Sequence, residues 1–260
     1  RELAARKKLE NALKLSNAEL ETVNKELEAF AETVSNDLRA PLRSIEGFIQ
    51  ALMEDRGDRL DEVGRDYCRR VYSASHRMTQ LIEAMQSMAQ LTSGELRERV
   101  VNLSAAAQVS AYELKKKEPG RQVEFIITKG LKAKGDTDML KLVIENLFDN
   151  AWKFTGKHAT ARIEFGVMSS EFGERSRKSS NSQLPTPNSQ LVYYVRDDGA
   201  GFPMEYADRL FQPFRRLHAS AEFPGIGIGL AIAHNIIRRH GGHMWAEAEV
   251  EKGATFFFTL

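Results

Sequence analysis

The stretch VIENLFDNAWKFTGK, residues 143–157, shows two different faces of one predicted helix. Apolar side chains recur at three- and four-residue intervals, which predicts a helix with one buried stripe over residues 138–154. Asn146, Asn150 and Lys153 fall together on the adjoining face. Amide oxygens can ligate Mg²⁺ and an ammonium group can meet phosphate, so this face suits a metal-bound polyphosphate.

Two glycine-rich segments follow this helix along the chain. DDGAGF, residues 197–202, comes directly after a predicted strand, and Gly199 and Gly201 allow a tight turn that brings the backbone against a flat ligand. The carboxylate of Asp197 can accept a hydrogen bond from the exocyclic amine of adenine, where guanine has a carbonyl. GIGIGLAI, residues 225–232, leads into a predicted helix whose free N–H groups and positive dipole end suit phosphate. Each element alone is a weak signal, but the three in this order and spacing predict a nucleotide site.

The N-terminal part of the chain is one long helical pattern. Apolar residues recur at heptad spacing over residues 9–34, which is typical of a coiled coil, and the same phase continues to residue 52. A second stripe covers residues 60–88, after a break at EDRGDR, residues 54–59. The two stripes predict an antiparallel helical hairpin. Because one hairpin has only a narrow seam to bury, we expect two copies to pair as a homodimer through a four-helix bundle.

Beyond residue 97, short strand patterns alternate with helical ones. This alternation predicts a two-layer α/β sandwich in which helices cover one face of a mixed sheet. Helices are expected after a cap at Ser104, at 138–154 and at about 228–240. Residues 169–190, rich in Ser, Asn and Pro, are expected to form a flexible insertion in a hairpin loop. Strands are expected within residues 99–103, 121–130, 160–168, 190–198, 243–250 and 253–260.

Composition narrows the possible function classes. The chain has 260 residues with 37 basic and 36 acidic side chains, and this balance argues against a nucleic-acid-binding protein. The single cysteine, Cys68, allows no intrachain disulfide, so we expect a small buried hydrophobe in a cytoplasmic protein. No apolar run approaches the roughly 20 residues that cross a membrane. The chain begins within a helical pattern and ends within a strand pattern, so we expect a piece of a longer protein with an upstream sensor domain.

Together with three further segments, these motifs resemble the sensor histidine kinases of two-component systems. The segments are FAETVSNDLRAPLRSI at residues 30–45, LFQPFRRLH at 210–218 and GATFFFTL at the end of the chain. The first resembles the phosphoacceptor helix of that family, and the others resemble its catalytic ATP-binding domain. The resemblance implies a coiled-coil signalling linker at 1–29, a dimerisation and histidine-phosphotransfer hairpin at 30–97, and a catalytic ATP-binding domain at 98–260.

The resemblance also implies roles at the nucleotide site. Asn150 would hold Mg²⁺, Asn146 and Lys153 would place the phosphates of ATP, and Asp197 would read the adenine amine. An ATP lid is expected at about 203–224. Further contacts to the nucleotide are expected from Phe211, Phe214 and Arg216 of the lid, and from Gly199, Gly201, Gly225, Gly227, Gly229 and Leu230 of the glycine-rich segments.

The acceptor segment departs from the family at one position. The family has a histidine whose ring nitrogen attacks the γ-phosphate of ATP, and here that position is Asn36, whose amide nitrogen has no available lone pair. Asp37 would be the acid that orients the ring. Arg39 adds positive charge, suited either to phosphate in transit or to a solvated helix face. His76, the other histidine of the hairpin, is expected to point to solvent without an adjacent acid.

Two functional hypotheses remain open at this point. The first is the catalytic core of a sensor histidine kinase that binds Mg²⁺-ATP and relays phosphate from a helix histidine to a response regulator aspartate. In this chain autophosphorylation would be blocked at Asn36, through either an engineered or a natural change. The alternative is an ATP-binding pseudokinase, or a dimeric interaction module, that signals by conformation without phosphoryl transfer. Hydrolysis of the gyrase and heat-shock chaperone type needs a glutamate where this chain has Asn146.

Overall fold

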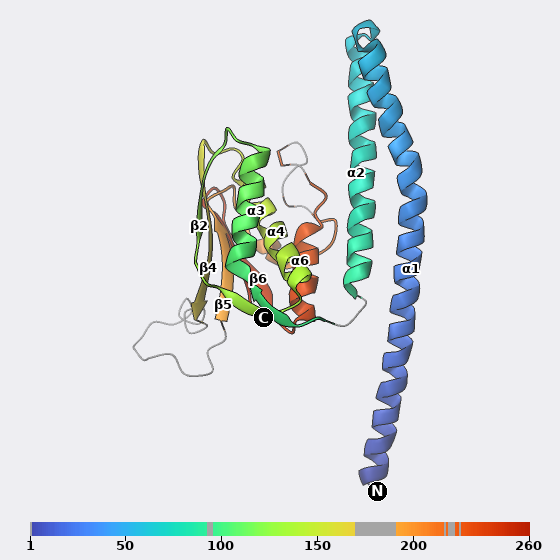
Figure 1. Ribbon diagram of the computed structural model, residues 1–260, viewed down its shortest axis with the longest axis vertical. Helices are drawn as coiled ribbons and strands as arrows, with labels where there is room; N and C mark the ends of the chain where they lie inside the picture. The colour runs from blue at the N-terminus through green and yellow to red at the C-terminus, as the bar shows by residue number, and fades with distance from the viewer. Residues whose placement is uncertain (1, 93–95, 170–190, 216, 218–221, 224) are drawn as a thin grey trace. The chain divides into compact units, whose positions relative to one another are not determined.

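The computed structural model describes residues 2–92, 96–169, 191–215, 217, 222–223 and 225–260 (Figure 1). It divides into two compact units, a helical unit at residues 1–95 and an α/β unit at residues 96–260. The expected insertion at 169–190 lies outside the described residues, apart from its first residue, Ser169.

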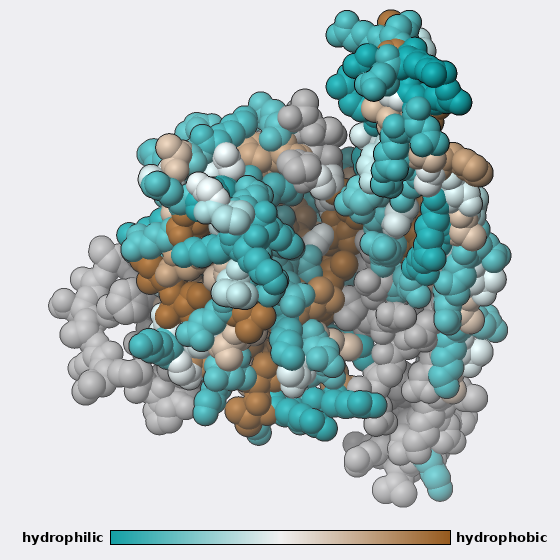
Figure 2. All heavy atoms as spheres, turned by 45° about the horizontal axis from the view of Figure 1, so that its top comes forward, coloured by the Kyte–Doolittle hydropathy of each residue, from teal (hydrophilic) through white to brown (hydrophobic). Residues whose placement is uncertain are grey.

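The helical unit is the predicted antiparallel hairpin. Helix α1 (Glu2–Arg56) continues through Pro41, the short 3-10 turn η1 (Gly57–Arg59) follows, and α2 (Glu62–Thr92) returns. The carboxylate of Asp61 accepts a hydrogen bond from the amide of Gly64 at 2.7 Å, which caps the start of α2. Figure 2 shows mostly hydrophilic side chains around this end of the hairpin. Within the described residues, no helix combines the length and the apolar content that a membrane span requires.

The contact between α1 and α2 buries small side chains together with Leu42 and Ile82. Ser75 donates a hydrogen bond from its hydroxyl to the carbonyl of Leu42 at 3.3 Å, and both residues are buried. Cys68 is also buried, which confirms the expectation of a small buried hydrophobe. Other large apolar side chains of the predicted stripes stay outside this contact. Those exposed in the single chain are Leu38, Ile45, Leu52, Tyr67, Val71 and Met78.

The α/β unit confirms the predicted sandwich with a mixed sheet. Helices α3 (Leu103–Lys117), α4 (Thr137–Phe154) and α6 (Gly229–Arg239) lie on one face of the sheet (Figure 1). Strands β2 and β4 pair in parallel, and the other neighbours pair antiparallel. The sheet runs in the order β2 (Gln122–Ile127), β4 (Thr160–Ser169), β5 (Leu191–Asp197), β7 (Gly253–Phe258), β6 (Met244–Glu249). Large side chains fully buried between the layers include Phe148, Phe165, Leu147, Ile163 and Ile236.

Two details of the α/β unit differ from the prediction. Ser104 does not cap α3: the side chain of Asn102 accepts the hydrogen bond from the amide of Ala105 at 3.0 Å. The hydroxyl of Ser104 instead donates to the carbonyl of Thr128 at 2.6 Å, because the helix begins two residues earlier than expected. Strand β1 (Arg99–Asn102) also pairs with a strand that was not predicted, β3 (Lys132–Gly135). KAKG carries no run of apolar residues that would have indicated a strand.

Candidate functional site

Helix α4 presents the polar face that the sequence predicted. Its first turn is capped by the carboxylate of Asp136, which accepts hydrogen bonds from the next helical amides at 3.1 and 3.3 Å. Asn146, Asn150 and Lys153 are half-buried on this helix. Asn146 donates its amide N–H to the carbonyl of Leu142 at 2.8 Å, so its side-chain orientation is fixed along the helix.

Arg121 fixes the last turn of α4, a role that could not be predicted from the sequence pattern. Its guanidinium donates to the carbonyl of Trp152 at 2.6 Å and to the hydroxyl of Thr155 at 2.7 Å. The same group lies 4.3 Å from the centre of the Trp152 ring, a cation–π contact. Lys153 and Phe154 lie between these anchored residues, so the clamp holds the end of the polar face in place.

Asp197 ends strand β5 in the interior of the sheet. Its neighbours in register are Ile163 of β4 and Ala254 of β7, and it is only 4% exposed. One carboxylate oxygen accepts the amide N–H of Gly199 at 2.9 Å. Burial raises the pKa of Asp197 to about 7, far above its usual 3.8, because a charged carboxylate loses hydration there. An acid that titrates near neutral pH inside a loop of glycines is a candidate for ligand recognition.

The loop after Asp197 packs directly against the end of α4. The amide of Ala200 donates to the carbonyl of Phe154 at 3.1 Å, and a Cβ atom on Gly199 would lie 2.6 Å from the same carbonyl oxygen. Gly201 has φ +57°, and a Cβ there would lie 2.0 Å from the carbonyl oxygen of Glu249. Both positions therefore need glycine, because any side chain would force the loop away from the helix or from β6.

The second glycine-rich segment lies against the polar face of α4. A Cβ atom on Gly229 would lie 2.5 Å from the side-chain oxygen of Asn146, and one on Gly225 would lie 3.3 Å from the ammonium nitrogen of Lys153. Gly229 is also the first residue of α6, so the amides at that N-terminus lie beside Asn146. The structure thus brings together the three elements that the sequence predicted to form one site.

The described part of the expected lid contacts this segment. Phe214 has φ +63° and donates its amide N–H to the carbonyl of Gly227 at 3.0 Å. Phe211 stacks on the ring of His234 in α6 with a centroid distance of 4.9 Å. Leu230 is half-buried in the first turn of α6. Arg216, the expected phosphate contact, lies outside the described residues.

A further residue at the site, Phe223, was not singled out in the sequence. Its ring is 3% exposed and lies 5.0 Å from that of Phe154 at the end of α4. The ammonium nitrogen of Lys157 lies 4.9 Å from the Phe223 ring and 3.4 Å from the carboxylate of Glu222. These contacts tie the end of the lid to the turn after α4. A lone aromatic residue in a glycine- and proline-rich stretch carries no period that would have indicated the contact.

Asn36 lies on the surface of α1 and takes part in a series of side-chain hydrogen bonds that crosses to α2. Its side-chain oxygen accepts a hydrogen bond from Arg39 at 3.1 Å, and Arg39 also donates to the side-chain oxygen of Gln86 at 2.8 Å. Asp37 is exposed beside it. Ser35 is fully buried, and its hydroxyl has no hydrogen-bond partner among the described residues.

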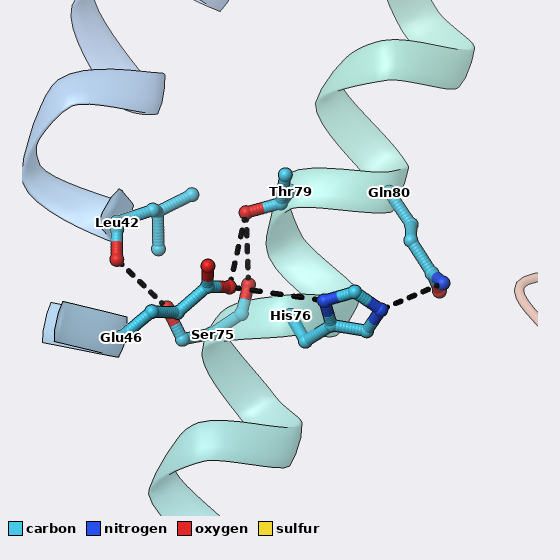
Figure 3. Close-up of polar contacts among 6 residues, drawn as sticks. All are labelled: Leu42, Glu46, Ser75, His76, Thr79 and Gln80. Carbon is cyan, nitrogen blue, oxygen red and sulfur yellow. Dashed lines mark hydrogen bonds and ion pairs between the residues drawn. The ribbon is translucent and has the colours of Figure 1, made fainter. Parts of the chain in front are cut away.

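His76 differs from its expectation, as Figure 3 shows. Its ring is exposed as expected, but an acid does lie beside it: the Nδ1 atom is 3.9 Å from the carboxylate of Glu46 on α1. The expectation of no adjacent acid was wrong because it considered only neighbours along α2. The packing of α1 against α2 brings residues that are thirty positions apart to the same level.

Two family models match the chain. Residues 26–94 match the His Kinase A (phospho-acceptor) domain, and residues 135–260 match the Histidine kinase-, DNA gyrase B-, and HSP90-like ATPase domain.

Curated relatives cover nearly the whole chain. Cyanobacterial phytochrome B of Nostoc sp. is 32% identical over 246 residues, which is 94% of this chain and 30% of the relative. The sensor protein kinase WalK of Staphylococcus aureus is 25% identical over 248 residues, which is 93% of this chain and 55% of the relative. The chain therefore spans less than two thirds of the length of these relatives.

Solved structures show the same fold at lower sequence identity. Full-length ShkA, in complex with AMPPNP, matches with a TM-score of 0.61 and 20% identity, over 90% of this chain and 45% of that protein. The Acinetobacter baumannii histidine kinase AdeS matches with a TM-score of 0.51 and 20% identity, over 86% of this chain and 96% of that one.

Proposed function

We propose, on the premise that this chain belongs to the histidine kinases of two-component signalling, that it is the catalytic core of a sensor kinase that binds Mg²⁺-ATP. The observation that carries this proposal is the convergence of the α4 polar face, the buried Asp197 and the N-terminus of α6. In this core, transfer to the family's acceptor position is blocked by Asn36. Because the reaction consumes ATP, this core would act in the cytoplasm.

The nucleotide pocket has a separate group for each part of the ligand. Asp197, when ionised, would accept a hydrogen bond from the exocyclic amine of adenine, while Gly199 and Gly201 let the backbone approach the ring. The ammonium group of Lys153 and the free amides at the start of α6 would bind the phosphates. The glycine contacts support this assignment, because a side chain at Gly199 or Gly229 would fill the space against α4, and one at Gly201 would clash with the backbone of β6.

A magnesium ion fits the donor set of α4. Asn146 and Asn150 offer amide oxygens, which are hard ligands without charge, and the phosphates of the nucleotide would complete the coordination. Asn150 would be the protein ligand, with Asn146 beside it on the preceding turn. The metal would neutralise charge on the phosphates during transfer. Asn146 is not a base, so no group at that position activates water, and the pocket favours phosphoryl transfer over hydrolysis.

The segment 203–224 would form the lid over this pocket. Phe211 anchors its first part to α6 through the ring of His234, and Phe214 anchors it to the glycine-rich segment through the carbonyl of Gly227. Arg216 would contact phosphate from this lid. Leu230, in the first turn of α6, would pack beside the bound nucleotide.

The rest of the chain would serve dimerisation and signal input. Residues 1–29 would be the coiled-coil linker from an upstream sensor domain, residues 30–97 the dimerisation and phosphotransfer hairpin, and residues 98–260 the catalytic domain. The exposed apolar stripe of α1 and α2 supports a homodimer, because a second hairpin would cover it. A response regulator receiver domain would be the partner that accepts phosphate.

The contacts of Asn36 support a second candidate function. Arg39 links Asn36 to Gln86, so the amide is part of an interhelical chain rather than an isolated surface group. Such a hydrogen-bonded connection between α1 and α2 fits a pseudokinase that binds ATP and signals through the conformation of the hairpin. In the first function, Arg39 would lie beside a transferred phosphoryl group and Asp37 would orient the acceptor ring.

Calorimetric titration of ATP with and without Mg²⁺ tests the pocket. Asn150→Ala should weaken binding in the presence of Mg²⁺ by about tenfold or more, the scale of effects at metal sites, and should matter little without the metal. The matched control is Asn235→Ala, an exposed asparagine on α6, which should bind as the parent does. Equal affinities of Asn150→Ala and the parent in Mg²⁺ would contradict the assignment.

A further inference from the structure

His76 and Glu46 form a polar pair across the hairpin, apart from the site of Asn36 (Figure 3). The Nδ1 atom of His76 lies 3.9 Å from the nearer carboxylate oxygen of Glu46, at ion-pair distance. Thr79 approaches the same oxygen with its hydroxyl at 3.5 Å. The hydrogen bond from Ser75 to the carbonyl of Leu42 lies beside the pair and fixes the level at which the two helices meet.

The neighbours of the imidazole determine which ring nitrogen carries the lone pair. The side-chain amide nitrogen of Gln80 lies 3.2 Å from Nε2 of His76, and an amide nitrogen can only donate. Nε2 is therefore the acceptor, and the ring proton sits on Nδ1, which faces Glu46. The ring of Tyr72 stacks parallel to the imidazole at 6.2 Å, with an interplanar angle of 3°, and holds its plane.

The pair lies on the flank of the hairpin away from the exposed apolar stripe. Counted from the buried Leu42 at about 100° per residue, Glu46 lies at roughly +40° and Ile45 at roughly −60° on α1. Counted from the buried Ser75, His76 lies at roughly +100° and Met78 at roughly −60° on α2. A second hairpin covering the stripe would leave His76 accessible, and its side chain is 54% exposed in the single chain.

Asn36 lies on the same flank as this pair. Six residues before Leu42, it falls at roughly +120° on α1, and the ten residues to Glu46 correspond to about 15 Å along the helix. His76 thus has an exposed imidazole whose Nδ1 atom faces the carboxylate of Glu46. It lies on the flank of the hairpin where the family has its acceptor histidine. This chain has no imidazole at the acceptor position itself.

We propose that His76 accepts a phosphoryl group on Nε2. The lone pair of Nε2 attacks phosphorus after the Gln80 amide turns away, and the bond from phosphorus to the donor oxygen breaks. The leaving group is a carboxylate when the donor is an acyl phosphate, or ADP when the donor is ATP. The proton stays on Nδ1, and the carboxylate of Glu46 stabilises the positive charge that the ring acquires. The proposal takes its phosphoryl chemistry from the proposed function.

The experiment treats the full chain with acetyl phosphate in one arm and with Mg²⁺-ATP in the other. Phosphohistidine is mapped by mass spectrometry under alkaline conditions, which preserve it. His76 should gain phosphate at least about tenfold faster than His243, an exposed imidazole in the α/β unit, because tenfold is the low end of the effect of an opposite charge within about 6 Å on a charged group. Labelling from acetyl phosphate identifies an acyl phosphate donor, and labelling only from ATP identifies the nucleotide.

Matched variants separate this chemistry from a structural role. His76→Gln should lose the modification, and Glu46→Gln should slow it about tenfold while the hairpin keeps its helix content. The control is Glu54→Gln, an exposed acid of α1 that accepts a hydrogen bond from Gln50, and it should leave the rate unchanged. Absence of phosphate on His76 in both arms, or equal rates in Glu46→Gln and the parent, overturns the proposal. Failure of the proposed function would appear at residue 36 of the Asn36→His variant, a different site.

Discussion

Replacing Asp197 by asparagine should stabilise the folded α/β unit at alkaline pH and remove nucleotide binding. The parent carboxylate is 4% exposed, and burial raises its pKa to about 7 from 3.8. Between these two values the folded protein holds a proton that the unfolded chain has released. The free energy of unfolding therefore falls as pH rises through this window, and the loss is complete above about pH 7.

The size of the effect follows from the same two pKa values. The difference between 3.8 and about 7 corresponds to roughly 4 kcal/mol of stability lost at pH 8. Asparagine avoids this loss and can still accept the amide N–H of Gly199, but it gives up the hydrogen bond from the amide of Ala254. That bond is worth about 1 to 3 kcal/mol with its unpaired donor. We therefore expect a net gain of about 2 kcal/mol at pH 8, which turns into a net loss of about 2 kcal/mol toward pH 4, where the parent no longer carries the cost of the buried charge.

Urea unfolding at several pH values measures this gain. The two tryptophans, Trp152 and Trp245, both lie in the α/β unit, so their fluorescence reports on that unit alone. Asp198→Asn is the control, because this neighbouring acid is exposed and the variant keeps Asp197, so its stability should fall with rising pH as that of the parent does. A gain that does not change with pH would contradict the buried charge at Asp197, and ATP affinity that survives Asp197→Asn at pH 8 would contradict its role in binding.

Two further substitutions test the exposed apolar stripe of α1 and α2 and the loop after Asp197. Val71→Glu places a charge in the exposed stripe and should weaken self-association more than about 100-fold in analytical ultracentrifugation, because an unpaired buried charge costs several kcal/mol. Arg77→Gln, with the same change of charge on an exposed position, should not, and a dimer unaffected by Val71→Glu would argue against the stripe as the interface. Gly201→Ala should cost about 3 kcal/mol or more in urea unfolding, since its Cβ would lie 2.0 Å from a backbone oxygen at φ +57°. Gly120→Ala, whose Cβ meets nothing within 4 Å, serves as its control, and similar midpoints for the two would be the contrary result.

The fold followed from periodicity and from turn residues. Heptad spacing predicted the hairpin, and the residues at EDRGDR marked the turn that joins α1 to α2. Glycines in DDGAGF and GIGIGL marked two places where the backbone approaches α4 closely, because a missing Cβ is itself a sequence signal. Each of these elements could therefore be predicted from a short local stretch of the sequence.

Contacts between residues that are far apart along the chain could not be predicted from the sequence. Arg121 clamps α4 from the start of β2, and Glu46 meets His76 across the hairpin, yet neither residue stands out from its neighbours. Strand β3 was missed because its pairing with β1, rather than its own composition, determines that it is extended. Such features depend on tertiary register, which a single chain's local pattern does not contain.

The proposed function implies that residue 36 alone prevents phosphoryl transfer from ATP to helix α1. Incubating the Asn36→His variant with γ-labelled ATP and Mg²⁺, followed by mapping of the label, tests it directly. We expect an acid-labile, base-stable label at residue 36 of the variant and none at residue 36 of the parent. The contrary result is a variant that binds ATP tightly and carries no label at residue 36, which would instead support the pseudokinase.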